Sequence, residues 1–236
     1  MMKSSLLIIF LICFTSTVSA EKVIHISAVD GSSDSVAALS VVREAYNRLG
    51  YEIDIHWYKG VEALNKSNSG DTDAELQRID GLSKKFPNLI QISIPINFLQ
   101  GSVFTVGQSI EILSWHSLEP YKIGIVDGII FAKQGTAGMD VKVAKSYPEL
   151  FSFLKTGQVD VAVMPRINGL HKIKKNKEYD IKEVDGVLET LFLYHYVHKK
   201  HRHLVPLLEK TFKEMLLDGT TRSLRNSAYN KILAKE

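Results

Sequence analysis

Strand and helix signals alternate through this chain in two similar series, and this alternation constrains the fold more than any other feature. The first series has strand patterns at 22–29, 51–57 and 89–96 and helix patterns at 35–50 and 61–69. The second series has strand patterns at 121–126, 139–144 and 159–164 and helix patterns at 128–135 and 146–157. Strands that alternate with helices predict parallel sheets covered by helices. We therefore predict an α/β protein with two lobes.

Two further helix signals support this organisation. Ser146 and Glu149 form a capping box at the start of a helix, and Gly157 follows its last turn. Near the C-terminus, residues 204–219 place four apolar side chains on one side of a helix, namely Leu204, Leu208, Phe212 and Met215. We expect this C-terminal helix to pack back on the rest of the chain.

The first 20 residues have the features of a cleavable secretory signal. Lys3 precedes an apolar run from Leu6 to Phe14 that is too short to span a bilayer, and small residues follow up to Ala20. We expect a signal peptide at residues 1–20, cleavage after Ala20 and export to the periplasm. The single cysteine, Cys13, lies inside this segment without the small preceding residue of a lipidation site. The mature chain therefore has no thiol for disulfides or thiolate chemistry.

Composition and motifs exclude several classes of function. The formal net charge is only +3 at pH 7, so nothing demands a nucleic-acid partner, and we expect a monomer. The chain has no nucleophile elbow, no phosphate-cradling loop and no dinucleotide fingerprint. We therefore predict no catalytic residue and no cofactor.

Two clusters raise the question of a metal site. The first is the acidic stretch with Asp71, Asp73, Glu75 and Asp80, but Leu76 and Gln77 stand where a calcium loop would need ligands. The second is the histidine-rich stretch 195–203, in which neighbouring lysines and an arginine disfavour a cation and favour a basic surface turn. We predict no metal site at either cluster.

Four segments, in this order and spacing, resemble the bacterial periplasmic solute-binding proteins of the polar-amino-acid class, in a divergent branch. They are GDTDAELQRI…FPNLIQISIPI, YKIGIVDGIIFA, LFSFLKTGQVDVAVMP and LFLYHYVHKKHRHLVPLLEKTFKEMLLDG. The resemblance implies a two-lobe periplasmic binding protein-like type II fold, each lobe a mixed sheet flanked by helices. It places lobe 1 at 21–105 plus 190–236 and the inserted lobe 2 at 106–189. We expect separate sheets in the two lobes, linked by crossings near 101–107 and 186–193.

The resemblance also indicates a ligand site between the lobes. It places Glu75 and Arg78 near the cleft. Two residues spaced by three in an extended strand would face opposite ways, whereas both can face the ligand if Arg78 begins a helix or loop. A surface salt bridge and a catalytic carboxylate pair of Asp73 with Glu75 remain alternatives for this stretch. Asp30 is added because it ends the first strand, where α/β sheets usually present ligand contacts.

From the second lobe we expect contributions by the backbone at Gly128 and by Arg166. Four aromatic side chains are candidates for the walls of the cleft, with burial in the core as the alternative: Trp57, Tyr58, Phe98 and Tyr194.

Two departures from the pattern of the resembled class bear on the ligand. Ile129 follows Gly128 where a Thr or Ser would help to hold a ligand carboxylate. Pro165 stands where an acid would hold the ligand's ammonium group. With Arg78 and Arg166 expected to face one cleft, a plain carboxylate or dicarboxylate is favoured over an amino acid.

Three functions remain open. The chain could be a periplasmic binding protein that delivers a small carboxylate-bearing or amino-acid-like solute to the permease of an ABC transporter. It could instead present its ligand to a membrane receptor as a sensory partner. The third function is an enzyme of the cyclohexadienyl-dehydratase type, which would need a general acid in the cleft such as Glu75.

Overall fold

The computed structural model describes residues 22–107, 110–178 and 180–234. The predicted signal peptide, its cleavage site after Ala20 and the lone Cys13 lie outside these ranges. Within them, every helix is too short or too polar to cross a membrane.

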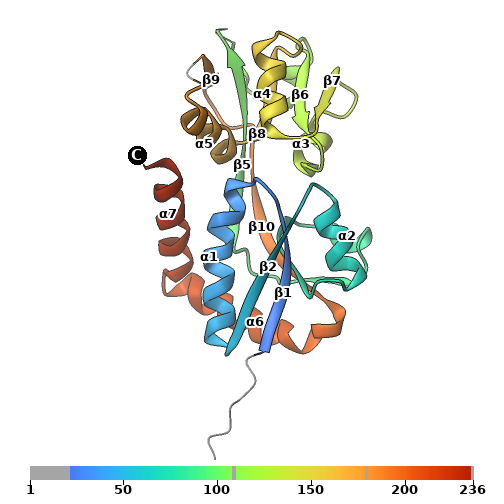
Figure 1. The fold of residues 1–236 in the computed structure, drawn as a ribbon, viewed down its shortest axis with the longest axis vertical. Coiled ribbons are helices and arrows are strands. Elements are labelled where there is room, and N and C mark those ends of the chain that lie inside the picture. The colour runs from blue at the N-terminus through green and yellow to red at the C-terminus, as the bar shows by residue number, and fades with distance from the viewer. Residues whose placement is uncertain (1–21, 108–109, 179, 235–236) are drawn as a thin grey trace, which may run out of the picture.

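Two α/β lobes lie one above the other (Figure 1). The first lobe contains β1 (Lys22–Val29), α1 (Ser33–Arg48), β2 (Tyr51–Tyr58), α2 (Glu62–Ser69), β3 (Ala74–Ile79), β4 (Leu89–Gln91), α6 (Val205–Leu217) and α7 (Thr220–Leu233). The second lobe contains β6 (Ile123–Val126), α3 (Ile130–Gly135), β7 (Val141–Ala144), α4 (Tyr147–Lys155), β8 (Val161–Pro165), α5 (Arg166–Asn176) and β9 (Ile181–Glu183). Two longer strands, β5 (Asn97–Val106) and β10 (Glu189–His198), run between the lobes. Short 3₁₀ helices lie at Leu82–Lys84, Trp115–Leu118 and Lys199–Leu204.

Each lobe contributes parallel strands to a mixed sheet. In the first lobe β1 pairs in parallel with β2 and β3, and β10 joins β3 in the antiparallel direction. In the second lobe β6 pairs in parallel with β7 and β8, and β8 joins β5 in the antiparallel direction. The predicted two-lobe α/β fold, with mixed sheet flanked by helices, is confirmed.

The prediction of two separate sheets is wrong. β5 and β10 pair with each other in the antiparallel direction from Asn97–Leu193 to Gly101–Glu189. The strands therefore form one hydrogen-bonded network in the order β2-β1-β3-β10-β5-β8-β6-β7, with β4 and β9 attached. The reason is that both crossing segments are themselves strands long enough to pair in each lobe. The residue limits proposed for the lobes stay a prediction, since β5 and β10 belong to both.

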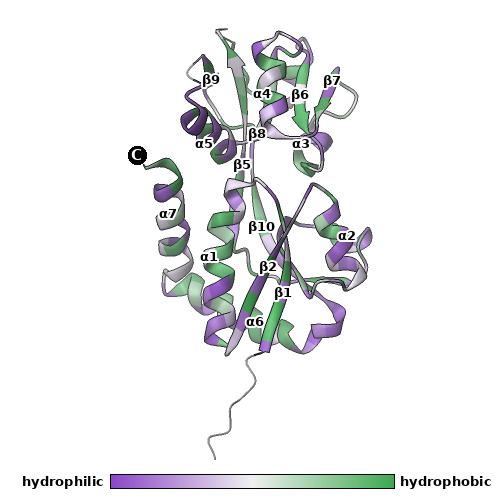
Figure 2. Cartoon of the chain, viewed as in Figure 1, coloured by the Kyte–Doolittle hydropathy of each residue, from purple (hydrophilic) through white to green (hydrophobic). Residues whose placement is uncertain are grey.

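Apolar faces explain how the helices pack. α1 buries Ala38, Val41, Val42 and Ala45 at helical spacing in a core shared with β1, β2 and β3, and α6 adds a second apolar face to the same core. In the second lobe the Ser146 hydroxyl accepts a hydrogen bond from the Glu149 amide, as the capping box predicts, and α4 packs on β6 and β8. α5 differs, because it is largely hydrophilic along its length (Figure 2).

Two segments differ from their predicted form. The strand predicted at 89–96 covers only Leu89–Gln91, and beyond it the Ile92 and Ile96 amides each donate to a carbonyl oxygen of β10 at 2.9 Å, with Pro95, which has no amide hydrogen, between them. His195, expected in a basic surface turn, is fully buried in β10, where its ring lies 3.0 Å from the Tyr46 hydroxyl and 3.1 Å from the Leu76 carbonyl oxygen. Burial lowers the pKa of His195 to about 4.

Candidate ligand-binding site

A pocket lies between the lobes, at the ends of strands from both of them. The first lobe lines it with the ends of β1 and β3 and the first turn of α1, and the second lobe lines it with the turn before α3 and the end of β8. We call it the interlobe pocket, and its lining residues are Val29, Ser32, Asp34, Ser35, Gln77, Arg78, Ile79, Leu99, Gly128, Ile129, Ile130, Phe131, Pro165 and Leu193. The ends of strands are where open α/β sheets usually bind ligands.

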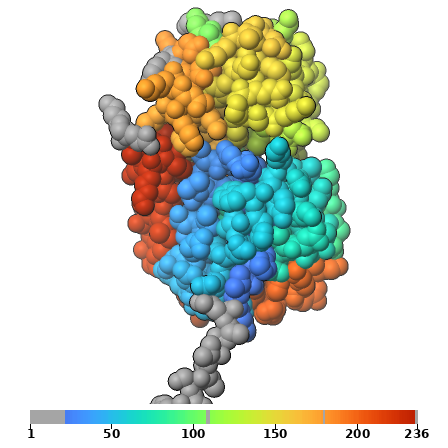
Figure 3. Space-filling model, in the orientation of Figure 1, coloured from blue at the N-terminus to red at the C-terminus, as the bar shows by residue number. Residues whose placement is uncertain are grey.

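The interlobe pocket is small in this arrangement of the lobes. Its volume of ≈ 70 Å³ leaves room for a few water molecules. Pockets that hold small organic molecules usually measure roughly 300 Å³ or more. On the face shown in Figure 3 the lobes touch across their shared waist. A solute larger than a few water molecules therefore requires the lobes to separate.

Asp34 supplies the acidic side chain of the pocket. It lies in the first turn of α1 and is 3% exposed. Its Oδ1 atom accepts a hydrogen bond from the Tyr229 hydroxyl at 3.4 Å, whereas its buried Oδ2 atom has no partner among the described residues. Burial raises the pKa of this carboxyl to about 7. An unsatisfied buried oxygen of this kind favours a ligand that donates hydrogen bonds or carries positive charge.

Arg78 lines the same pocket and is anchored by Glu75. The Arg78 Nε atom donates to Glu75 Oε1 at 2.6 Å, and Nη2 donates to the Gly60 carbonyl oxygen at 3.2 Å. Glu75 is fully buried and accepts a second hydrogen bond, from the Ser27 hydroxyl at 2.6 Å. Burial raises the pKa of Glu75, and the Arg78 guanidinium opposes that effect. The N–H groups of Arg78 Nη1 form no hydrogen bond with any residue that the structure describes.

A β-bulge explains how Glu75 and Arg78 meet. Tyr196 pairs with Glu75 and Tyr194 pairs with Arg78, so β3 advances by three residues while β10 advances by two. The extra residue in β3 rotates Arg78 onto the face that Glu75 occupies. The expectation that a spacing of three would point these side chains in opposite directions is therefore wrong, and so is the alternative of a surface salt bridge.

The lobes touch where Gly128 meets Gly60. Gly128 has a φ of +78°, and a Cβ atom at this position would lie 2.4 Å from the Gly60 Cα atom. Only glycine fits here, because the backbone is left-handed and the other lobe leaves no room for a side chain. Since Arg78 donates to the carbonyl oxygen of Gly60, the same contact also orders the guanidinium.

A second contact joins the start of α1 to α5. The Ser33 amide donates to Asn168 Oδ1 at 2.7 Å, and the Ser33 hydroxyl lies 2.7 Å from His171 Nδ1. Asn168 is itself held by a hydrogen bond of 2.6 Å to the Tyr147 hydroxyl. Burial and the charges of neighbouring lysines lower the pKa of His171, so its neutral ring suits this contact. We call Ser33, Asn168 and His171 the interlobe latch.

Arg166 and Phe98 line a different pocket, together with Gln100 and Tyr229, and Asp34 lines both this pocket and the interlobe pocket. Leu99 faces the interlobe pocket, whereas Phe98 and Gln100 point to the opposite face of β5. The Arg166 guanidinium forms two hydrogen bonds with the Glu183 carboxylate, of 2.8 and 3.1 Å. The expectation that Arg78 and Arg166 face one cleft is therefore wrong.

The remaining predicted residues lie outside both pockets. Asp30 directly follows the last residue of β1, but it is exposed and its amide donates to the Tyr58 carbonyl oxygen at 2.8 Å. Trp57 is 43% exposed on β2, and the neighbouring Tyr58 is half-buried. None of the three lines the interlobe pocket.

No family model matches the chain. An uncharacterised protein of Shewanella oneidensis is 26% identical over 196 residues, which cover 80% of this chain and 74% of that protein.

Comparisons with solved structures are more informative. A histidine kinase sensor domain with similarity to periplasmic binding proteins has a TM-score of 0.75 at 15% identity, over 88% of this chain and 96% of that chain. The GluR0 ligand-binding core in complex with L-glutamate has a TM-score of 0.77 at 9% identity, over 89% and 100%. The amino acid ABC transporter substrate-binding protein AbpA of Streptococcus pneumoniae, bound to L-arginine, has a TM-score of 0.70 at 19% identity, over 90% and 97%.

Two of these structures hold a bound amino acid and the third is a sensor domain, and at such identities the likeness establishes the fold alone. The chain therefore has the fold shared by periplasmic amino-acid-binding proteins and by sensor domains built on the same plan.

Proposed function

We propose that this protein is an exported solute-binding protein that captures a small amino-acid-like solute in the interlobe pocket. The supporting observation is that Arg78 and Asp34 line one pocket. A guanidinium with free donors matches a carboxylate, and a buried carboxylate with an unsatisfied oxygen matches an ammonium group. Ser32, Ser35 and Gln77 add polar groups to the same wall.

This proposal revises the plain carboxylate favoured by the sequence. That preference rested on Pro165, which stands where the resembled class has its ammonium-binding acid. Asp34, in the other lobe, lines the interlobe pocket and is the acid that we propose instead, whereas Arg166 is engaged with Glu183. One guanidinium and one carboxylate fit a zwitterion better than a dicarboxylate.

Capture of the solute requires the lobes to separate and then to close. The interlobe latch and the contact between Gly60 and Gly128 hold the lobes together around a pocket of ≈ 70 Å³. A solute would enter a form with separated lobes, and contacts to both lobes would then favour closure by population shift.

Delivery to an ABC transporter permease in the inner membrane is the role that we propose for the loaded protein. It is supported by the secretory features of residues 1–20 and by the likeness to an amino acid ABC transporter substrate-binding protein. Mass spectrometry of the native protein should find a soluble periplasmic chain that begins at Glu21. An intact N-terminus, or an acyl group on Cys13, would contradict the proposed export.

A sensory role is the second candidate, because a histidine kinase sensor domain has the same fold. In that role the loaded protein would bind a membrane receptor in place of a permease. Crosslinking of the exported protein in intact cells, with and without solute, separates the two roles by the identity of the membrane protein captured.

The structure does not favour the dehydratase alternative. Glu75 was the candidate general acid, but it is fully buried, forms hydrogen bonds with Ser27 and Arg78, and is absent from the lining of the interlobe pocket. A general acid must lie within hydrogen-bond reach of its substrate. We therefore propose binding without turnover.

The experiment is a thermal-melting screen of amino acids, organic acids and sugars against the wild type and three variants, Asp34→Asn, Arg78→Lys and Asp30→Asn. An amino acid at a hundredfold excess over its dissociation constant should stabilise the wild type by about 2.7 kcal/mol. Asp34→Asn preserves the shape of the side chain but removes the charge, and it should weaken binding by about 10- to 100-fold, as expected for one charged hydrogen bond. Asp30→Asn is the matched control and should bind as the wild type does.

Two outcomes would contradict the proposed site. If organic acids without an amine stabilise the wild type and Asp34→Asn equally, the ammonium partner is wrong. If Arg78→Lys, which keeps the charge beside Glu75 but loses the planar fork, binds the solute as tightly as the wild type, the carboxylate partner is wrong.

A further inference from the structure

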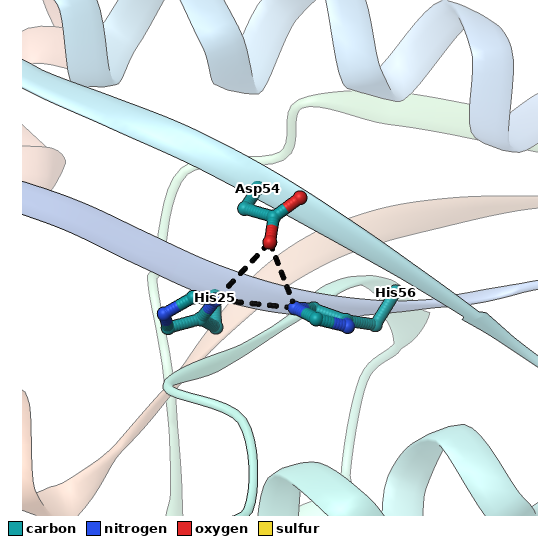
Figure 4. A group of neighbouring side chains, drawn as sticks. All are labelled: His25, Asp54 and His56. Atoms are coloured by element: carbon teal, nitrogen blue, oxygen red, sulfur yellow. Dashed lines mark hydrogen bonds and ion pairs between the residues drawn. The ribbon is translucent and has the colours of Figure 1, made fainter.

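Three metal-ligating side chains meet on the outer strands of the first lobe. His25 lies on β1, and Asp54 and His56 lie on β2 (Figure 4). The two strands pair in parallel with His25 opposite Asp54, and Asp54 and His56 are two residues apart. All three side chains therefore leave the same face of the sheet. The neighbouring Ile24 and Ile53 point to the opposite face, into the core under α1.

The three ligand atoms are equally spaced. His25 Nδ1 lies 3.1 Å from His56 Nε2 and 3.3 Å from Asp54 Oδ2, and His56 Nε2 lies 3.2 Å from the same oxygen. Zinc sites have bond lengths of about 2.0–2.1 Å to nitrogen and tetrahedral geometry, which together place neighbouring ligand atoms about 3.3–3.4 Å apart. The observed triangle is close to one face of such a tetrahedron.

A hydrogen-bonded trio explains this triangle less well. Both rings could donate an N–H to the Asp54 oxygen, but the two protonated nitrogens would then lie 3.1 Å apart with no hydrogen bond between them. A cation about 0.9 Å out of the plane of the triangle would be about 2.05 Å from all three atoms, within the range of zinc bonds.

We propose that His25, Asp54 and His56 form a binding site for a divalent transition-metal ion, with Zn²⁺ as the ion that fits best. Imidazole nitrogens suit Zn²⁺, Ni²⁺ and Cu²⁺, whereas Mg²⁺ and Ca²⁺ prefer a full set of oxygen ligands. Three protein ligands leave a fourth position for water. That position faces solvent, because the three side chains are 50%, 54% and 39% exposed.

The site is built on rigid backbone and is separate from the interlobe pocket. The His25 amide donates to Asp73 Oδ2 at 2.8 Å, and the Asp73 amide donates to the His25 carbonyl oxygen at 2.7 Å. None of the three ligands lines the interlobe pocket. The sequence prediction of no metal site concerned the acidic stretch 71–80 and the histidines 195–203, and these three residues are brought together only by the pairing of β1 with β2.

The experiment titrates metal-free protein, residues 21–236 with any affinity tag removed, with Zn²⁺ in competition with a chromophoric chelator. One equivalent of Zn²⁺ should bind per chain, and Co²⁺ should give the absorption spectrum of a four-coordinate ion. Mg²⁺ and Ca²⁺ should not compete. If no equivalent is bound at about 100 µM free Zn²⁺, a hundred times a micromolar dissociation constant, the proposed site is refuted.

Variants assign the binding to these side chains. His25→Ala, His56→Ala and Asp54→Asn should each weaken Zn²⁺ binding by at least about tenfold. His116→Ala is the matched control, because His116 is exposed and pairs with a carboxylate, Glu119, in the second lobe. It should bind as the wild type does.

The folding of the variants is checked without metal. All three ligands are solvent-accessible, so the variants should keep the unfolding midpoint of the metal-free wild type. If His25→Ala loses stability, His56→Gln on the edge strand β2 tests the same ligand set. Unchanged Zn²⁺ affinity in folded variants, or an equal loss in His116→Ala, would overturn the proposal.

Discussion

Replacing Asp34 by asparagine should remove a pH-dependent loss of stability. Burial raises the pKa of Asp34 from 3.8 to about 7, so between these values the folded protein holds a proton that the unfolded chain has released. The contribution of Asp34 to stability is therefore largest below pH 3.8 and is lost as pH rises through the window up to about 7. A shift of about three pKa units corresponds to about 4 kcal/mol, at 1.36 kcal/mol per unit. Because Asp34 is 3% exposed, solvent does little to reduce this effect.

The assay is urea denaturation of ligand-free wild type and Asp34→Asn at a series of pH values from 4 to 8. Asparagine does not titrate, so the free energy of unfolding of the variant minus that of the wild type should rise by about 1.4 kcal/mol per pH unit and level off above about pH 7. Taking the difference removes the contributions of groups that titrate in both proteins.

A pH-independent difference between wild type and Asp34→Asn would refute the reasoning, since it would mean that Asp34 ionises equally easily in the folded and unfolded states. The same titration predicts how solute binding should behave. If the ionised Asp34 carboxylate receives the ammonium group of the solute, affinity should increase as pH rises toward 7 and then stop increasing.

Three further predictions follow from buried contacts. Arg78→Ala should destabilise the fold by about 3–5 kcal/mol in urea denaturation, because it leaves Glu75 buried without its partner. Adding Glu75→Gln should recover part of this loss, and an additive loss in the double variant would argue against the ion pair. Gly128→Ala should force the lobes apart, since the Cβ atom of the alanine would lie 2.4 Å from the Gly60 Cα atom. Small-angle X-ray scattering should then show a larger radius of gyration, and an unchanged radius would contradict the close approach of Gly128 to Gly60. His195→Gln should reduce the fall in the free energy of unfolding between pH 6.5 and pH 4, because burial holds the pKa of His195 at about 4 against 6.5 in the unfolded chain. The wild type then loses about 3 kcal/mol as pH falls from 6.5 to 4, and an equal fall in the variant would exclude this cause.

Local patterns were enough to predict most helices and strands. The alternation in β2 and the helical spacing of apolar residues in α1 depend only on neighbours within a few residues, so the sequence carries them directly. The pairing of β5 with β10 depends on residues about 90 positions apart, and no local pattern encodes it. For the same reason the crossings were located approximately but were not recognised as partners in one sheet.

The site was harder to predict than the fold. Arg78 and Gly128 do line the interlobe pocket, while their role in binding stays a prediction. Asp34 was missed because the sequence analysis chose the acid nearest the end of β1, which is Asp30. The turn after β1 instead brings Asp34, in the first turn of α1, to the pocket. Its signal was the stretch SSDS, which places an acid in the first turn of a helix that follows a strand.

The bulge in β3 and the two faces of β5 explain why the predictions for the Glu75–Arg78 pair and for Phe98 were wrong. An extra residue in one strand cannot be seen in the spacing of Glu75 and Arg78, yet it decides whether they meet. Phe98 was assigned to the cleft wall from its position near the crossing, but a shift of one residue along a strand changes the face, and Leu99 takes that place.

The paired strands β5 and β10 also limit how the lobes can move. Five residue pairs from Asn97–Leu193 to Gly101–Glu189 fix the register of the two strands, so sliding one lobe along the other would break the whole ladder at once. Bending or twisting of this two-stranded ribbon keeps the ladder intact and leaves rotation as the accessible motion. Displacement in a rotation grows with distance from the axis, so a shift of a fraction of an ångström beside the ribbon becomes a movement several times larger at the far end of the second lobe. In either of the two roles proposed above, a membrane protein that contacts both lobe tips would detect the bound state from their separation alone, without touching the solute.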